Sequence, residues 1–323
     1  MRAWLPDRQV FGPEPAAERD IEGLNQVFAD AFTDRYRRDG LTGVRVPYLN
    51  PQVWRYALLD AGAGAMLWRD EAGHIAAFNV AHRSGAEGWM GPLVVRPDRQ
   101  GGGVGKAIVR TAVDWLLEQG VATLGLETMP RTVENIGFYA RLGFVPGLLT
   151  VTLTNDIATR GHLPPTLLSQ RKGAAGGNTL EAARRLVGTL APGYDFTREL
   201  VLTAELALGD TCVVEGDDGL DALVLWHSSP LADGRPKDEV RVLKLAARDE
   251  RSFDAGIAAT EAAAARAGIR RVAIRCQTRF DAAFRRLVAR GYRVRWTDLR
   301  MIYEGYAEPH PSGGGVLFSN WEI

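Results

Sequence analysis

A run of glycines between a predicted strand and a predicted helix constrains this chain more than any other stretch. Four glycines fall within residues 101–105, and they remove the Cβ atoms that would keep a ligand away from the backbone. The apolar, β-branched run at 93–95 precedes them, and Pro97 ends that predicted strand. After them, apolar residues recur at three- and four-residue spacing from Val104 to Leu116, which predicts a helix with one buried face.

A strand, a glycine loop and a helix in this order are typical of an anion site. The first backbone amides of a helix have no acceptor within the helix. An anion there also meets the positive end of the helix dipole, which is worth about 0.3–2 kcal/mol. Lys106 adds a positive charge beside the loop. By themselves, however, the glycines are equally compatible with a tight turn that holds no ligand.

Length and composition limit the classes of protein to consider. The 323 residues are enough for two domains with separate cores. With 39 basic and 39 acidic side chains, the chain offers no electrostatic basis for binding nucleic acid or an acidic membrane. The N-terminal residues form no signal-peptide core and no apolar run is long enough to span a bilayer, so a cytoplasmic location is expected. Cys212 and Cys276 lack metal-type spacing, so we expect reduced core thiols and no metal.

The order of predicted elements occurs twice along the chain. In each copy helical periodicity precedes three short strands, after which helix, strand, helix and strand follow. In the first copy these elements are predicted at 17–33, 65–69, 75–82, 88–95, 104–116, 122–128, 132–142 and 148–154. The intervening stretch is rich in Gly, Pro, Ser and Ala and has no periodicity. The sequence therefore predicts a first domain at 1–155, a linker at 156–178 and a second domain at 179–323.

Two pairs of residues define the offset between the copies. Gly120-Val121 matches Gly268-Ile269, and Gly143-Phe144 matches Gly291-Tyr292, in both cases 148 positions later. At this offset the glycine loop aligns with residues 248–253, which have no glycine and carry two carboxylates. Charge repulsion and Cβ atoms would exclude a phosphate there. Only the first domain is therefore expected to bind an anionic cofactor.

The C-terminal residues 313–318 read as a glycine turn followed by a short strand. The first copy has no equally clear final strand before its linker. We therefore expect the two copies to share or exchange terminal strands, which would tie them into one rigid unit.

Three motifs in order make the first domain resemble the GCN5-related N-acetyltransferase (GNAT) family. Residues 100–105 (QGGGVG) fit the family's QxxGxG/A pyrophosphate motif, and residues 138–144 (FYARLGF) resemble its FYxxLGF segment. Glu127 lies on the strand between them, where many relatives have a carboxylate. The resemblance is specific over about 86–145 and architectural in the second copy. It implies an α/β (α+β) fold of two tandem GNAT-like domains, each a mixed, mostly antiparallel sheet flanked by helices, with a degenerate second domain that lacks the CoA pyrophosphate loop.

The resemblance further implies an N-acetyltransferase that moves an acetyl group from acetyl-CoA to a primary amine by direct attack on the thioester. Tyr139 corresponds to the family's tyrosine beside the leaving sulfur, with a core aromatic contact as the alternative. Glu127 is either the general base, through a water, or a buried ion-pair partner. Thr132 stands where many relatives have an asparagine that touches the cofactor, and it is also a plausible N-cap. The implied cofactor-binding residues are Leu93, Val94, Val95, Gln100, Gly101, Gly102, Gly103, Val104, Gly105, Lys106 and Thr132.

A non-catalytic acyl-CoA-binding or interaction module of the same fold is the alternative function. For the enzyme, the expected partner is a small-molecule or peptide amine, with no nucleic acid or membrane, and the chain is expected to be a monomer or homodimer. The segment 34–59 mixes tyrosines and arginines with glycines and prolines. It is interpreted either as a lip of the acceptor cleft or as an ordinary loop and helix surface.

Overall fold

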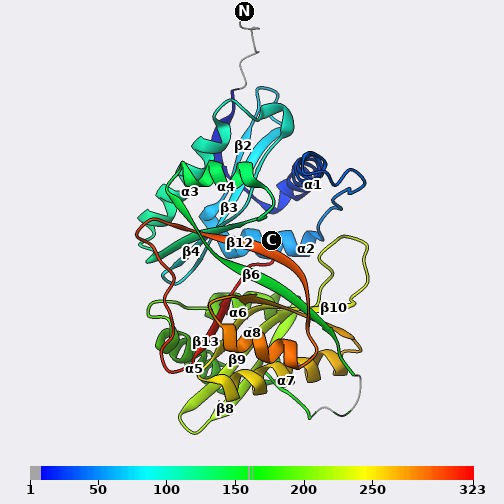
Figure 1. Cartoon of the computed structure of the whole chain (residues 1–323), viewed down its shortest axis with the longest axis vertical. Coiled ribbons are helices and arrows are strands. Elements are labelled where there is room, and N and C mark those ends of the chain that lie inside the picture. Colours follow the sequence, from blue (N-terminus) through cyan, green and yellow to red (C-terminus); the bar gives the residue numbers. More distant parts are fainter. Residues whose placement is uncertain (1–8, 159–160, 162) are drawn as a thin grey trace, which may run out of the picture.

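A single mixed sheet runs through the whole molecule, with helices packed on it in an upper and a lower half (Figure 1). The structure is a computed structural model and describes residues 9–158, 161 and 163–323. The thirteen strands follow the order β1-β2-β3-β4-β5-β12-β6-β11-β10-β9-β8-β7, and β13 pairs with β10 beside this path. The mixed α/β architecture expected from the sequence is confirmed.

The elements alternate in two similar series along the chain. The strands are β1 (Phe11–Pro15), β2 (Ala65–Arg69), β3 (Ile75–Ser84), β4 (Glu87–Val95), β5 (Thr123–Thr128), β6 (Phe144–Asp156), β7 (Thr166–Leu167), β8 (Gly209–Gly216), β9 (Gly219–His227), β10 (Glu239–Ala247), β11 (Arg271–Gln277), β12 (Arg293–Tyr303) and β13 (Val316–Ser319). The helices are α1 (Ile21–Arg38), α2 (Pro51–Ala61), α3 (Val104–Glu118), α4 (Val133–Ala140), α5 (Ala174–Leu190), α6 (Thr197–Glu205), α7 (Glu250–Arg266) and α8 (Asp281–Ala289).

Most predicted elements are found, and the differences have local causes. The predicted linker at 156–178 is partly helical, because α5 begins at Ala174 rather than near residue 180. Gly176 and Gly177 weaken a helix by about 1 kcal/mol each, but the apolar face further along α5 packs into the core of the lower half. Strand β1 was not predicted, because its two prolines argue against a strand. It pairs only with β2, at the edge of the sheet where proline is tolerated.

The two halves exchange one long strand each, as expected, but the exchanged strands are β6 and β12, whereas the C-terminal strand β13 pairs with β10 of its own half. Strand β6 leaves the upper half, and its second part, Thr150–Asp156, pairs antiparallel with the whole of β11. Strand β12 returns from the lower half and inserts between β5 and β6. The cores follow the exchange, since Val151 and Leu153 of β6 belong to the lower core while Met301 of β12 belongs to the upper core.

The C-terminal residues form a second connection between the halves. Figure 1 places the C-terminus between them. The Trp321 ring stacks on Trp89 of β4 with a centroid separation of 5.6 Å, and Lys244 Nζ of β10 lies 3.6 Å from the centre of the Trp321 ring. The Ser319 hydroxyl donates to Glu87 at 2.6 Å and accepts from Lys244 at 2.8 Å. Side chains from both halves therefore share one buried polar cluster.

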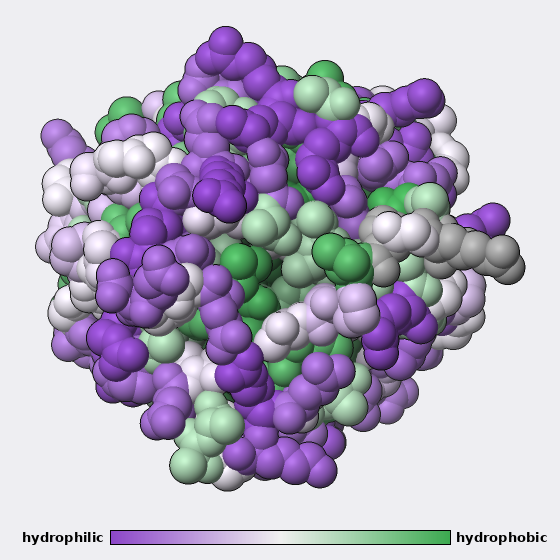
Figure 2. Space-filling view, turned by 90° about the horizontal axis from the view of Figure 1, so that it is seen from below, coloured by the Kyte–Doolittle hydropathy of each residue, from purple (hydrophilic) through white to green (hydrophobic). Residues whose placement is uncertain are grey.

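The surface at the far end of the lower half is mostly hydrophilic. Seen from that end, polar side chains surround a smaller apolar area near the centre of the face (Figure 2). No helix among the described residues has the length and hydropathy needed to cross a membrane.

The strand exchange predicts that the two halves unfold together. Unfolding either half removes the neighbours of β6 or β12 and so disrupts the other core. Differential scanning calorimetry should show one transition with equal calorimetric and van't Hoff enthalpies. Two resolved transitions would contradict the coupling.

Candidate functional site

The sheet of the upper half opens where β4 and β5 separate. The two strands pair in parallel only over Glu87–Met90 and Thr123–Leu126. The register between β3 and β4 then shifts between Asn79 and Ala81, and the rest of β4 continues along β3 alone. Such irregularities bend a strand away from its neighbour. A cavity of about 360 Å³ lies at this opening.

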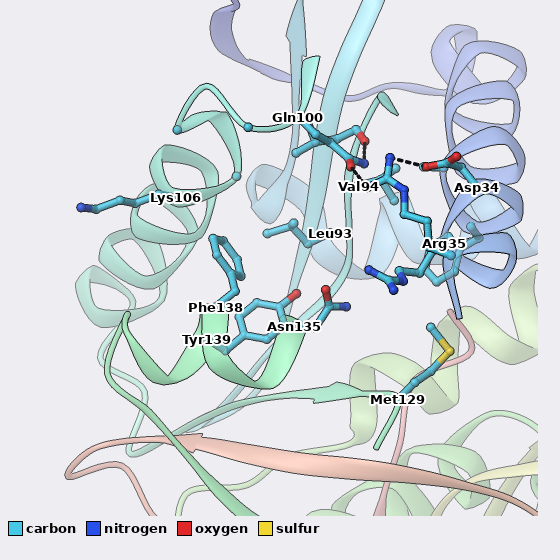
Figure 3. A pocket seen from close by; sticks show the side chains of 17 residues that line it. Asp34, Arg35, Leu93, Val94, Gln100, Lys106, Met129, Asn135, Phe138 and Tyr139 are labelled. Atoms are coloured by element: carbon cyan, nitrogen blue, oxygen red, sulfur yellow. Dashed lines mark hydrogen bonds and ion pairs between the residues drawn. The ribbon is translucent and has the colours of Figure 1, made fainter. Parts of the chain in front are cut away.

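The cavity collects side chains and glycines from five parts of the upper half (Figure 3). Nine of the residues implied by the resemblance line it: Leu93, Val94 and Val95 on β4, Gln100, Gly101, Gly103, Gly105 and Lys106 at the loop and the start of α3, and Tyr139 on α4. The other lining residues are Ala31, Phe32, Asp34, Arg35 and Arg38 on α1, Met129 after β5, and Asn135 and Phe138 on α4.

The glycine loop has the backbone that an anion site needs. Gly101 and Gly103 have φ values of +85° and +86°, which L side chains rarely adopt. Gly103 is the N-cap of α3 and supplies no side-chain acceptor for the first amides of this helix. A Cβ atom on Gly105 would lie 3.4 Å from the Phe138 ring. The donors, the helix dipole and the absent Cβ atoms fit the diphosphate of CoA.

Gln100 connects the loop to β4 and α1. Its Nε2 donates to the carbonyl of Val95 at 2.9 Å, and its Oε1 accepts from Arg38 at 3.2 Å. Arg38 is also paired with Asp34 at 2.6 Å. In Figure 3 the Lys106 side chain extends away from Tyr139 and Asn135, on the outer side of α3. Gln100 therefore positions the loop, while Lys106 contributes charge at its rim.

Tyr139 presents a buried hydroxyl to the cavity. The side chain is 9% exposed, and burial raises its pKa to about 12. In Figure 3 its hydroxyl and the Asn135 amide point into the same space below Leu93. At neutral pH this phenol holds its proton and is able to donate a hydrogen bond.

Glu127 lies outside the cavity lining, in an ion-pair cluster. Its carboxylate accepts from Arg275 of β11, from Arg300 of β12 at 2.8 Å and from the Thr150 hydroxyl of β6. Burial favours the protonated acid, but the two arginines outweigh it and the pKa of Glu127 is lowered. Of the two roles that the sequence left open, this geometry supports the ion-pair partner. A carboxylate paired on both oxygens is a weak proton acceptor.

Three residues implied as cofactor contacts do not line the cavity. Thr132 is fully buried, and its hydroxyl donates to Asp39 at 2.8 Å, so it holds the end of α1. It makes no side-chain cap bond either. Val104 packs in the core beside Ile108, and Gly102 is the remaining implied residue outside the lining. Asn135, three residues after Thr132, is the asparagine that lines the cavity.

The end of α1 is the part of the site that sequence reasoning located least well. Asp34, Arg35 and Arg38 line the cavity, which is compatible with a cleft lip for the first residues of segment 34–59. Arg35 pairs with Asp39 and, at 3.1 Å, with Glu134 of α4. No decisive charge cluster marks this segment in the sequence. No group of three metal-ligating side chains occurs within the described ranges.

The lower half has the same opening in its sheet, but the protein fills it. Strands β10 and β11 pair in parallel only over Glu239–Val242 and Arg271–Ile274. Beyond that point β13 pairs with β10, from Lys244 to Ala247. Only Arg248 and Asp249 separate β10 from α7, and the Asp249 carboxylate already accepts from the Ser252 amide at 2.8 Å. The lower half thus differs from the upper half in two ways: the loop between the strand and the helix is shorter, and it has no glycines.

Comparison with known proteins agrees with this geometry. No curated protein matches the chain in sequence. Among solved structures, a GCN5-related N-acetyltransferase from Sphaerobacter thermophilus is 17% identical, with a TM-score of 0.56, 96% of this chain and 98% of that chain covered. A tandem GNAT protein from the clavulanic acid biosynthesis pathway is 13% identical, with a TM-score of 0.59 and coverage of 94% and 99%. Saccharomyces cerevisiae N-myristoyltransferase with bound myristoyl-CoA is 11% identical, with a TM-score of 0.63 and coverage of 94% and 85%.

These likenesses show the fold, and a family model matches part of the sequence. A profile described as "Acetyltransferase (GNAT) family" matches residues 26–144. This range contains the end of α1, the glycine loop and Tyr139, which together line the cavity. Residues 26–144 are therefore similar to the acetyltransferase (GNAT) family, as the motifs in the sequence implied.

Proposed function

We propose that this chain is an N-acetyltransferase that transfers the acetyl group of acetyl-CoA to a primary amine in the cavity of the upper half. One observation carries the proposal: the uncapped N-terminus of α3 and the Tyr139 hydroxyl lie on the same cavity. The first suits a diphosphate and the second suits a departing thiolate. The structural relatives include GNAT acetyltransferases and an acyltransferase with bound acyl-CoA, which supports an acyl-CoA cofactor.

The residues around the cavity divide the work of binding and proton transfer. Acetyl-CoA supplies the activated acyl group as a thioester. Gly101, Gly103 and Gly105 allow the backbone to approach the diphosphate, and Leu93–Val95 of β4 offer an edge for the pantetheine arm, as the resemblance implies. Tyr139 keeps its proton at neutral pH, since its pKa lies near 12, and its hydroxyl is placed to donate a hydrogen bond to the developing thiolate. Two arginines bind the Glu127 carboxylate, so it is a weak proton acceptor. The amine therefore loses its proton to water, or binds in its neutral form.

We also propose that residues 1–155 hold the single cofactor site and that residues 179–323 form a degenerate domain around it. The filled opening beside β10 and the two-residue connection to α7 support this division of roles. The lower half then contributes β12 to the upper sheet rather than a second reaction centre.

Release of free thiol from acetyl-CoA with a panel of primary amines tests the proposal directly. We expect thiol release that saturates with both substrates and depends on the amine. Saturable binding of acetyl-CoA without thiol release for any amine would instead favour a non-catalytic acyl-CoA-binding module.

Substitution Gly103→Glu should abolish CoA binding, because it places a carboxylate and a strained residue in the diphosphate cradle. Gly120→Glu is a matched control, since Gly120 also has a positive φ (+71°) and an open environment but lies at the far end of α3. Isothermal titration calorimetry with CoA should detect binding to the control and not to Gly103→Glu. Equal losses in the two variants would show that backbone strain alone explains the effect.

Substitution Tyr139→Phe should lower kcat by about 10²–10⁴-fold with little change in CoA affinity, because it removes a proton donor and keeps the ring. Since the pKa of Tyr139 is near 12, the wild-type rate should show no loss from its ionisation below about pH 11. Steady-state kinetics of thiol release from pH 6 to 10 measures both effects. An unchanged kcat in the variant would leave Tyr139 as a packing residue.

Substitution Glu127→Gln should cost about 3–5 kcal/mol of unfolding free energy at pH 7, because it leaves Arg275 and Arg300 without their shared carboxylate. The pKa of Glu127 is lowered in the folded state. Its contribution is therefore present above the ordinary value of 4.5 and is lost as the pH falls through the folded value. Urea unfolding at pH 7 and pH 4 should show a smaller difference from wild type at pH 4. Loss of the acidic limb of the pH–rate profile, without loss of stability, would restore Glu127 as the general base.

A further inference from the structure

A second cavity adjoins the cofactor cavity and is lined by both halves of the chain. It has a volume of about 380 Å³ and lies between the loop that follows β5 and the first part of β12. Its lining residues are Met129, Pro130, Arg131, Val294, Arg295, Trp296 and Thr297. Met129 also lines the cofactor cavity, so the two spaces meet at this side chain. A molecule seated in the second cavity therefore reaches toward the reaction centre.

The β12 segment at this cavity is shaped by an irregularity in the strand. Its register with β6 shifts between Val294 and Trp296, so that Arg295 is an extra residue on β12. In a regular strand successive side chains would alternate between the two faces. Here Val294, Arg295 and Trp296 are all exposed, and the two apolar side chains are 52% and 42% exposed. Bulges of this kind re-aim side chains and are frequent beside active sites.

The lining carries uncompensated positive charge. Arg131 donates to the carbonyl of Asp39 at 2.5 Å, and the Asp39 carboxylate that its charge also acts on is already bound to Arg35 and Thr132. Arg295 pairs with no acidic side chain within the described ranges. The lining contains neither Asp nor Glu, and the nearby Asp298 is already bound to Arg275 at 3.0 Å and to the Trp296 indole at 3.1 Å. Two arginines thus line the cavity together with an exposed tryptophan.

We propose that this second cavity binds the acceptor, and that the acceptor is an amine that also carries an anionic group, a carboxylate or a phosphate. The inference rests on the proposed function and adds its substrate class. Arg295 and Arg131 bind the anionic group, and Trp296 and Val294 cover the adjoining apolar part of the molecule. The amine then points past Met129 toward the thioester. The lower half supplies this recognition through β12.

Matched pairs of amines that differ only in the anionic group test the proposal. L-Phenylalanine is compared with 2-phenylethylamine, and O-phosphoethanolamine with ethanolamine, so that a carboxylate and a phosphate are separate arms. We expect kcat/KM for at least one anionic member to exceed that of its neutral partner by about tenfold. Substitution Arg295→Gln should remove this preference by raising KM for the anionic member of the pair. Arg293→Gln, an exposed arginine on the same strand outside the lining, is the control and should behave as wild type.

Binding measured without turnover separates this inference from the proposed function. Isothermal titration calorimetry of the same amines into the protein saturated with CoA needs no acetyl transfer. Tighter binding of an anionic member, lost in Arg295→Gln and kept in Arg293→Gln, supports the acceptor cavity even if no thiol is released. Equal binding of charged and neutral amines, or equal losses in the two variants, would overturn it.

Discussion

Without β12 between them, β5 and β6 would each leave a row of backbone N–H and C=O groups unpaired in the middle of the molecule. Unpaired strand edges are unstable and invite association with other chains. Here β12 pairs with β5 on one side and β6 on the other, and β6 continues the ladder to β11. The backbone of each half is therefore completed by a strand from the other half.

The exchange also explains why so much charge is buried at the seam. Arg300 on β12 is almost fully buried, and it donates to Glu127 of β5 and to Glu308 at 2.6 Å, while its guanidinium lies 4.0 Å from the centre of the Trp89 ring. Arg275 approaches the same Glu127 from β11. Buried pairs add little net stability over apolar packing, but losing one partner is costly. We infer that these pairs make the exchanged arrangement specific, because they form only when β12 and β11 take their observed places.

Local patterns predicted the elements and much of the cofactor cavity, since glycine loops, β-branched runs and helical periodicity are local properties. Strand β2 has the predicted bounds, and nine of the implied residues line the cavity. What failed depends on tertiary contacts. The sequence could not show that Arg275 and Arg300 arrive at Glu127 from 148 and 173 residues away, or that Thr132 would meet Asp39. The offset of 148 matches the C-terminal end of α3 to that of α7, but it does not match the end of β4 to the end of β10. The alignment therefore did not reveal that the loop before α7 is shorter than the loop before α3.

The two halves show that one sheet geometry serves opposite purposes, depending on what fills the opening. In both halves the central parallel pair lasts for four residues and then separates. In the lower half β13 pairs with the free edge of β10, and Asp249 caps the next helix. In the upper half the edge of β4 and the first turn of α3 keep their backbone groups available to a ligand. The lower half fills its own opening and does not have to keep a cofactor site, so its residues can differ from those of the upper half. One of its strands, β12, lies beside the site of the upper half. It carries Arg295 and Trp296 from the filled half to the rim of the open one.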